Sequence, residues 1–194
     1  ETGILPTGSG KSLCYQLPTY LIEKPTLVIS PLISLMDDQV MQMKLNGESH
    51  VSYIHSGMDE IEKRNHINQI SQSRFIYLSP EFLLQPQNFK LISHLDFGLI
   101  VLDEAHCLSE WGYDFRPHYA LIGQITSHFK NARILALTAT APPHLEEDLS
   151  HILSIDLNVI KTSMNRDNIS LQHKNFNDDE EKIKWLIPFL SYSG

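Results

Sequence analysis

Short runs of apolar and β-branched residues recur along the chain, with polar segments between them. Such runs are typical of strands that are buried on both faces of a sheet. They predict strands at residues 26–30, 51–55, 74–79, 98–103, 133–138 and 157–162, after a first strand at 2–5. Segments with helical periodicity lie between them, for example at 34–45, 60–70 and 143–153. Because strand and helix alternate, we expect an α/β fold of three layers, with a mostly parallel central sheet flanked by helices.

The pattern changes after Thr162, which predicts a domain boundary. We expect one domain at residues 1–162, a hinge at 163–170 and the truncated start of a second domain at 171–194. The second domain should open with a strand and a helix, and Pro188 should weaken that helix because proline interrupts the backbone hydrogen bonds. Since a strand is already under way at Thr2 and no methionine precedes it, we expect a fragment that is truncated at its N-terminus.

Composition narrows the class of protein. Hydrophobic residues make up 42% of the 194 residues and charged residues 20%, which excludes a disordered or fibrous chain. The net charge of -8 does not indicate a broad basic surface, so any binding of nucleic acid must be local. Cys14 and Cys107 are the only cysteines, which argues against a disulfide scaffold. We therefore expect an intracellular location. No apolar run approaches the roughly 18 residues that span a bilayer, so we expect no membrane partner.

The segment TGSGKS at residues 7–12 has the composition of a phosphate-binding loop. Gly8 and Gly10 allow a tight turn of backbone N–H groups, Lys11 would reach the outer phosphates, and Ser12 would offer its hydroxyl to magnesium. Leu5 stands where the strict motif has its first glycine, and an ordinary loop remains the alternative. The expected ATP contacts are Thr7, Gly8, Ser9, Gly10, Lys11 and Ser12.

The segment LIVLDEAH at residues 99–106 delivers two adjacent carboxylates to the end of an apolar strand. Asp103 would hold magnesium through water, and Glu104 would orient or deprotonate the attacking water. The alternative is a strand followed by an acidic pair that caps a helix. In LTATA at 137–141, Thr138 and Thr140 could link this site to neighbouring groups, although a threonine-rich turn after a strand is ordinary.

The combination of TGSGKS, DEAH and TAT resembles the first RecA-like motor domain of superfamily 2 helicases, a P-loop NTPase fold. The segments SLCYQLP, VISPLISLMDDQ and DEAHCLSEWGYDFRPHY are similar to those of the RecQ family of DNA helicases, and the resemblance runs from Ile4 to about Ile169. It implies an enzyme that uses ATP and Mg²⁺ to unwind DNA from 3′ to 5′ in recombination and repair. Its partners would be single-stranded DNA, duplex DNA with a 3′ tail and DNA repair proteins. Its location would be the nucleoid-associated cytoplasm of a bacterium or the nucleus of a eukaryote.

The resemblance also assigns roles to residues outside the phosphate site. His106 matches the residue that links hydrolysis to DNA contact, and Trp111, Phe115 and Arg116 match an aromatic-rich loop that binds DNA. Aromatic faces stack on bases without sequence preference, although a lone aromatic residue more often packs in a core. Contacts with the DNA backbone are also expected from Ser30, Ser34 and Gln39, where the alternative for the serines is helix capping.

Several parts of the family's motor are missing from the chain. They include the upstream glutamine motif that reads adenine and the second motor domain with its arginine finger, so we expect the fragment alone to bind ATP weakly and to be inactive or nearly so. Three other functions remain open: another superfamily 2 translocase or RNA helicase, a nucleotide-dependent interaction protein, and a small-molecule kinase. The WGYDFRP segment argues against the first, and the intact Lys11, Asp103 and Glu104 argue against the second.

Overall fold

Parallel strands flanked by helices make up the body of the chain. The computed structural model describes residues 2–5, 10–83, 85–110, 116–162, 169 and 173–190. The strands are β1 (Thr2–Ile4), β2 (Thr26–Ile29), β3 (Val51–Ile54), β4 (Phe75–Leu78), β5 (Leu99–Leu102), β6 (Arg133–Thr138) and β7 (Val159–Lys161). The helices are α1 (Leu13–Leu21), α2 (Ile33–Leu45), α3 (Glu60–Gln69), α4 (Pro80–Leu83), α5 (Pro86–Ile92), α6 (His106–Glu110), α7 (Arg116–His128), α8 (Leu145–Leu153) and α9 (Asp179–Leu190), with a short 3-10 turn at Ile70–Gln72.

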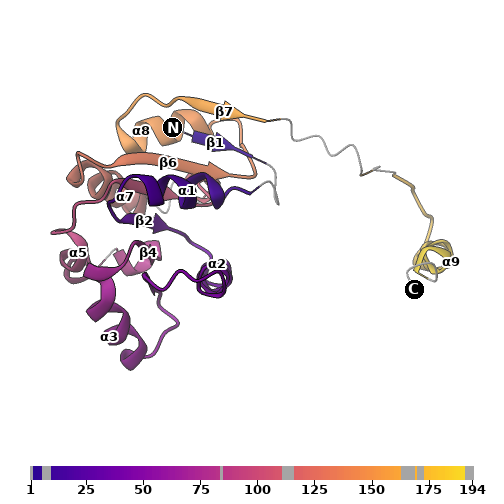
Figure 1. The fold of residues 1–194 in the computed structure, drawn as a ribbon. Helices are drawn as coiled ribbons and strands as arrows, with labels where there is room; N and C mark the ends of the chain where they lie inside the picture. Colours follow the sequence, from indigo (N-terminus) through magenta and orange to yellow (C-terminus); the bar gives the residue numbers. More distant parts are fainter. Residues whose placement is uncertain are drawn as a thin grey trace. The chain divides into compact units, whose positions relative to one another are not determined.

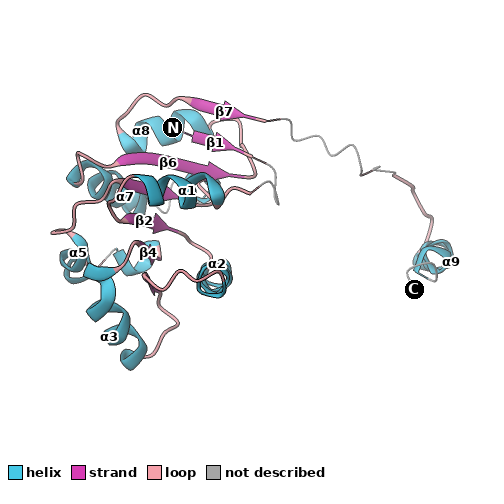
Figure 2. Cartoon of the chain, viewed as in Figure 1, coloured by secondary structure: helices cyan, strands magenta, loops and turns pink. Residues whose placement is uncertain are grey.

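One sheet contains all seven described strands, in the order β3-β4-β2-β5-β6-β1-β7 (Figures 1 and 2). Every pair of neighbours is parallel. The mostly parallel sheet expected from the sequence is therefore confirmed. The seven strands expected between residues 2 and 162 match the observed ones to within two residues at either end, as at 26–30 against Thr26–Ile29, whereas the described residues show no strand at the start of the expected second domain.

Side chains point alternately to the two faces of the sheet along each strand, and this divides the core into two layers. Ile76 and Leu78 of β4 pack in one cluster with residues of α5, α7 and α8, whereas Phe75 and Tyr77 pack in the other with Tyr15 of α1 and with α2. Successive side chains of a strand point to opposite faces, so both faces of the sheet are covered. The two layers of helices can be followed in Figure 1, and they confirm the three-layer fold.

The chain divides into two compact units, Glu1–Met164 and Asn165–Gly194. In the second unit, α9 begins after Asp178, whose carboxylate accepts a 2.8 Å hydrogen bond from the Glu181 backbone. The helix continues through Pro188 to Leu190, so the expected interruption does not occur. Proline near the end of a helix removes only one backbone bond of the last turn, which limits its cost. Among the described residues, no helix combines the length and the apolar character needed to cross a bilayer.

Candidate active site

Three neighbouring strands bring the candidate catalytic residues to one edge of the sheet. In the order β5-β6-β1, the carboxyl ends of these strands lead to Asp103 and Glu104, to Thr138, and to the loop that contains Lys11. Parallel sheets bind ligands beyond the carboxyl ends of their strands. Segments that lie far apart in the sequence therefore meet where the fold favours a site.

The phosphate-loop segment passes directly into α1. Gly10 has a φ of 83°, a left-handed conformation that favours glycine, and its carbonyl accepts a 2.9 Å hydrogen bond from the Leu13 backbone. Ser12 is the N-cap residue of α1, and its hydroxyl makes no capping bond to the helix backbone. Thr7, Gly8 and Ser9 lie outside the described residues. The described end of the loop has the turn and the helix start that a phosphate cradle requires.

Lys11 and Glu104 form an ion pair across this edge. Lys11 Nζ lies 3.2 Å from Glu104 Oε1, and both side chains are largely buried. Glu104 has a φ of 47°, which is uncommon for a residue with a Cβ atom. Such strained residues cluster at active sites, where the surrounding structure maintains them. The turn after β5 thus keeps the Glu104 carboxylate beside the lysine.

Asp103 is the more enclosed of the two acidic residues. It is 7% exposed, and its Oδ1 accepts a 3.1 Å hydrogen bond from the Glu104 backbone N–H. Burial, followed by the neighbouring Glu104 charge, raises the pKa of Asp103, although Lys11 and hydrogen bonds to the carboxylate act in the opposite direction. A cation beside a carboxylate that is buried and adjacent to a second acidic residue stabilises its charged form. Asp103 is therefore suited to binding a cation.

His106 connects Glu104 with the end of β6. Its Nδ1 lies 3.2 Å from Glu104 Oε2 and 2.9 Å from Thr138 Oγ1. The Thr138 hydroxyl donates its only proton to the Thr140 carbonyl at 2.8 Å, so His106 Nδ1 has to donate to Thr138. The proton of the neutral ring is thereby assigned to Nδ1. These contacts bring together the three residues expected to couple the site to its surroundings.

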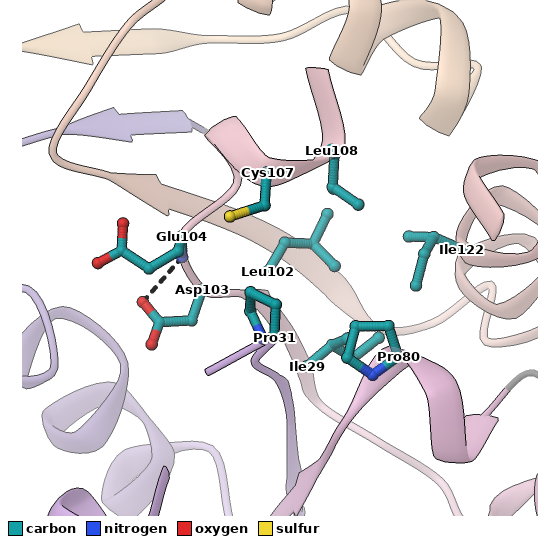
Figure 3. A pocket seen from close by; sticks show the side chains of 9 residues that line it. All are labelled: Ile29, Pro31, Pro80, Leu102, Asp103, Glu104, Cys107, Leu108 and Ile122. Carbon is teal, nitrogen blue, oxygen red and sulfur yellow. Dashed lines mark hydrogen bonds between the residues drawn. The ribbon is translucent and has the colours of Figure 1, made fainter. Parts of the chain in front are cut away.

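A pocket lies beside the two carboxylates (Figure 3). In Figure 3 the carboxyl groups of Asp103 and Glu104 lie on one side of it, apart from apolar side chains such as Leu108 and Ile122. Its lining residues are Ile29, Pro31, Pro80, Leu102, Asp103, Glu104, Cys107, Leu108 and Ile122. Apolar side chains thus lie on the side of the pocket opposite the acidic pair, and burial is the main cause of the raised pKa of Asp103.

The residues expected to bind DNA are only partly described. Trp111 and Phe115 lie outside the described residues, and Arg116 is the first residue of α7. Ser34 is exposed in the first turn of α2, whereas Ser30 is 2% exposed and its buried hydroxyl has no hydrogen-bond partner among the described residues. That enclosure disfavours a direct contact of Ser30 with DNA. Capping by serine is also not observed, because Leu32 is the N-cap residue of α2 and no side chain caps it.

Gln39 lies against the acidic pair. Its Nε2 is 3.5 Å from Asp103 Oδ2, and its Oε1 accepts a hydrogen bond from the Tyr15 hydroxyl. The sequence predicted neither contact, because 64 residues separate Gln39 from Asp103 and Tyr15 carries no catalytic signature. A tyrosine in an apolar core needs a hydrogen-bond partner for its hydroxyl. This requirement is the signal in the sequence that could have indicated a polar contact of Tyr15.

The donor set fits ATP with magnesium. Magnesium is usually bound by one or two carboxylates together with substrate phosphates and water. Asp103 and the Ser12 hydroxyl match that requirement, and Lys11 supplies a positive charge for phosphates. The described residues contain no cluster of three or more histidine, cysteine or acidic side chains that could hold a metal alone.

Comparison with known proteins identifies the family. Residues 2–148 match the family model of the DEAD/DEAH box helicases. The chain is 43% identical over 185 residues to the Bacillus subtilis protein named "Probable ATP-dependent DNA helicase RecS", covering 95% of this chain and 37% of that protein. It is 41% identical to the ATP-dependent DNA helicase RecQ of Haemophilus influenzae, covering 98% of this chain and 31% of the relative. The chain thus spans about a third of the length of these relatives.

Solved structures share the fold at lower identity. The Pyrococcus furiosus Hef helicase domain has a TM-score of 0.64 and 22% identity, covering 85% of this chain and 35% of that chain. The helicase MrfA bound to DNA has a TM-score of 0.68 and 18% identity, covering 83% of this chain and 23% of that chain. These likenesses support the RecA-like fold, and the sequence relatives support the resemblance to RecQ. The chain belongs to the DEAD/DEAH box helicase family, as a relative of the RecQ helicases.

Proposed function

We propose that the full-length protein is an ATP-dependent DNA helicase that moves from 3′ to 5′ along single-stranded DNA. In this proposal residues 1–162 form its first motor domain, 163–170 a hinge and 171–194 the start of the second motor domain. The observation that carries the proposal is the convergence of Lys11, Asp103 and Glu104 at one edge of the sheet. The names of the sequence relatives, all ATP-dependent DNA helicases, support DNA as the substrate.

In this proposal each residue of the site has a separate role in ATP hydrolysis. Lys11 binds the outer phosphates, with Thr7, Gly8, Ser9 and Gly10 contributing the loop around them. Asp103 and Ser12 would hold Mg²⁺, which neutralises charge that develops on the phosphates. Glu104 orients the attacking water and accepts its proton.

The ion pair between Lys11 and Glu104 has a consequence for this mechanism. The Lys11 ammonium group is paired with the Glu104 carboxylate. Binding of the phosphates would draw Lys11 away and leave the Glu104 carboxylate to act on water. The base would thus become available when the nucleotide is present.

Coupling to DNA follows from the contacts of His106. Because its Nδ1 contacts both Glu104 and Thr138, a shift of the turn at Thr138 and Thr140 would change the position of the catalytic carboxylate. Trp111, Phe115 and Arg116 would stack on bases and contact phosphates, with Ser34 on the DNA backbone. We place the protein with its DNA, in the cytoplasm of a bacterium near the nucleoid or in the nucleus of a eukaryote, together with DNA repair proteins.

The test is the ATPase activity of the full-length protein with single-stranded DNA and with RNA, and the unwinding of a duplex with a 3′ tail. We expect stimulation by DNA and unwinding from the 3′ tail. Glu104→Gln should lower turnover at least about 100-fold, because general base catalysis contributes that much. Lys11→Ala should also lower it, because the outer phosphates lose the positive charge that binds them. Glu147→Gln is the matched control, since Glu147 is exposed on α8.

Two results would contradict the proposal. Turnover that Lys11→Ala and Glu104→Gln leave unchanged would reject the site. Stimulation by RNA but not by DNA would leave the site intact and replace the DNA helicase with an RNA helicase.

A further inference from the structure

A chain of hydrogen bonds runs from α1 through α2 to Asp103. The Tyr15 hydroxyl of α1 donates to Gln39 Oε1 of α2, and Gln39 Nε2 faces Asp103 Oδ2 at 3.5 Å. Tyr15 is fully buried, and its hydroxyl also lies 3.1 Å from that of Tyr77. Tyr77 in turn lies 3.2 Å from Met43 Sδ. The polar end of Gln39 therefore contacts an ordered part of the core.

Only one orientation of the Gln39 amide satisfies both of its neighbours. An ionised carboxylate can only accept hydrogen bonds, so the amide nitrogen has to face Asp103. The amide oxygen then faces Tyr15, which has to donate. The phenol has one proton, and it points to Gln39 Oε1. Tyr15 thus fixes the face of Gln39 that the carboxylate meets.

We propose that Gln39, oriented by Tyr15, is a positioning residue for the Asp103 carboxylate. The proposal rests on the proposed role of Asp103 in binding magnesium. A carboxylate that ligates a metal usually accepts hydrogen bonds from outer partners that set its direction. The backbone N–H of Glu104 fixes Oδ1 and the Gln39 amide orients Oδ2, so each oxygen has one donor. Gln39 then acts on hydrolysis from within the protein, in place of the contact with DNA expected from the sequence.

The separation of 3.5 Å is at the long end for a hydrogen bond. Its effect therefore depends on how firmly the amide is held. Gln39 is half-buried on α2 and bonded to a fully buried hydroxyl, whereas Gln42, one turn further along the same helix, is exposed. Gln42 is the matched control for any change at Gln39.

The experiment compares Mn²⁺ binding to the full-length protein in the presence of ADP, followed by electron paramagnetic resonance. Gln39→Met keeps the length of the side chain and removes both hydrogen bonds. We expect it to weaken Mn²⁺ binding about 10-fold, the lower end of the effect of an outer partner of a metal ligand. Tyr15→Phe should weaken it in the same direction by a smaller factor, and Gln42→Met should leave it unchanged.

Activity adds a second readout. In the ATPase reaction, Gln39→Met should raise the Mg²⁺ concentration needed for half-maximal turnover by a similar factor, with kcat largely restored at saturating Mg²⁺. A loss of folding would instead lower kcat at every Mg²⁺ concentration and lower the unfolding temperature. The positioning role is overturned if both Gln39→Met and Tyr15→Phe show this loss of folding while their folded fraction binds Mn²⁺ as tightly as the wild type does.

Asp103→Asn separates this proposal from the proposed function. If the wild-type protein binds Mn²⁺, Asp103→Asn does not and Gln39→Met binds as the wild type does, only the role of Gln39 is wrong. If the wild-type protein and Asp103→Asn bind Mn²⁺ equally, or neither binds it, the metal-binding role of Asp103 is wrong. In that case Gln39 has no metal ligand to position, so the positioning role and the metal-binding role of Asp103 are both overturned.

Discussion

Glu104 combines a strained backbone with a catalytic role. Its φ of 47° places it in the left-handed region, which costs a residue with a Cβ atom about 1–2 kcal/mol. The conformation lets its carboxylate contact both Lys11 and His106. The strained backbone therefore places the catalytic carboxylate. Substitutions that remove the side chain can separate the cost of the strain from the loss of catalysis.

A pair of substitutions measures that strain. Glu104→Ala and Glu104→Gly both remove the carboxylate, but only glycine relieves the backbone. We expect Glu104→Gly to be more stable than Glu104→Ala by about 1 kcal/mol in urea unfolding, with both variants inactive. Equal stability of the two variants would show that the turn stores no strain at this position.

The raised pKa of Asp103 predicts that the stability of the chain depends on pH. Its pKa in the folded chain is raised above the ordinary value of 3.8, so the folded state favours the protonated carboxyl group. Between these two pKa values the folded state binds more protons than the unfolded state, and stability contributed by this group is lost as pH rises. At neutral pH the charged Asp103 therefore destabilises the chain in the absence of a cation.

Asp103→Asn removes this effect. We expect the variant to unfold at a higher urea concentration than the wild type at pH 7, because its amide is neutral. The difference should shrink as pH falls through the folded pKa and vanish well below 3.8, where Asp103 is protonated in both states. Unfolding curves of the two chains over this pH range measure it, and a difference that grows in acid would reject the raised pKa.

At the scale of elements, the packing of α7 against α8 depends on one glycine. A Cβ atom on Gly123 of α7 would lie 2.3 Å from the Ile152 carbonyl oxygen of α8. Glycine inside a helix ordinarily costs stability relative to alanine. The close approach of the two helices reverses that preference, because a backbone atom cannot move aside as a side chain does.

Gly123→Ala should therefore destabilise the chain. Overpacking of a core costs about 1–3 kcal/mol, and we expect a loss in that range by urea unfolding. Gln124→Ala, at the exposed next position of α7, should change the stability by less than about 0.5 kcal/mol. If Gly123→Ala were as stable as the wild type, the two helices would have to pack less closely than described.

The elements that the sequence could and could not predict differ in their physical basis. The strands were predicted because each is a short apolar run, and the strand ends then indicated Asp103 and Glu104. The short helices α4, α5 and α6 were not predicted, because fewer than eight residues carry little periodicity. The contact of Gln39 with Asp103 depends on how α2 packs on the sheet, and no local pattern contains that information.

At the scale of the whole molecule, the chain has relatives that are longer than it is. It spans between 24% and 37% of the length of the bacterial RecQ and RecS relatives. Related nucleotide hydrolases gain about 10³–10⁵ in rate from an arginine finger, supplied in cis or by a partner. We infer that the remaining length of the protein supplies that group.

The isolated chain of residues 1–194 should therefore bind ATP weakly and hydrolyse it at a rate at least about 1000-fold below that of the full-length protein. The measurement is ATPase activity of both proteins at saturating single-stranded DNA. The Glu104→Gln variant of each protein defines the background. DNA-stimulated turnover of the isolated chain at the full-length rate would show that all catalytic groups lie within these residues.

The position of β6 between β5 and β1 affects how precisely the site is maintained. The Thr138 carbonyl accepts a hydrogen bond from the Leu5 backbone at 3.0 Å, and the Leu137 carbonyl accepts one from Ala105 at 2.9 Å. The segment that leads to Lys11 and the segment that follows Glu104 are thus hydrogen-bonded to consecutive residues of one strand. We therefore expect the separation of Lys11 Nζ and the Glu104 carboxylate, 3.2 Å in the structure, to change little when the sheet as a whole moves.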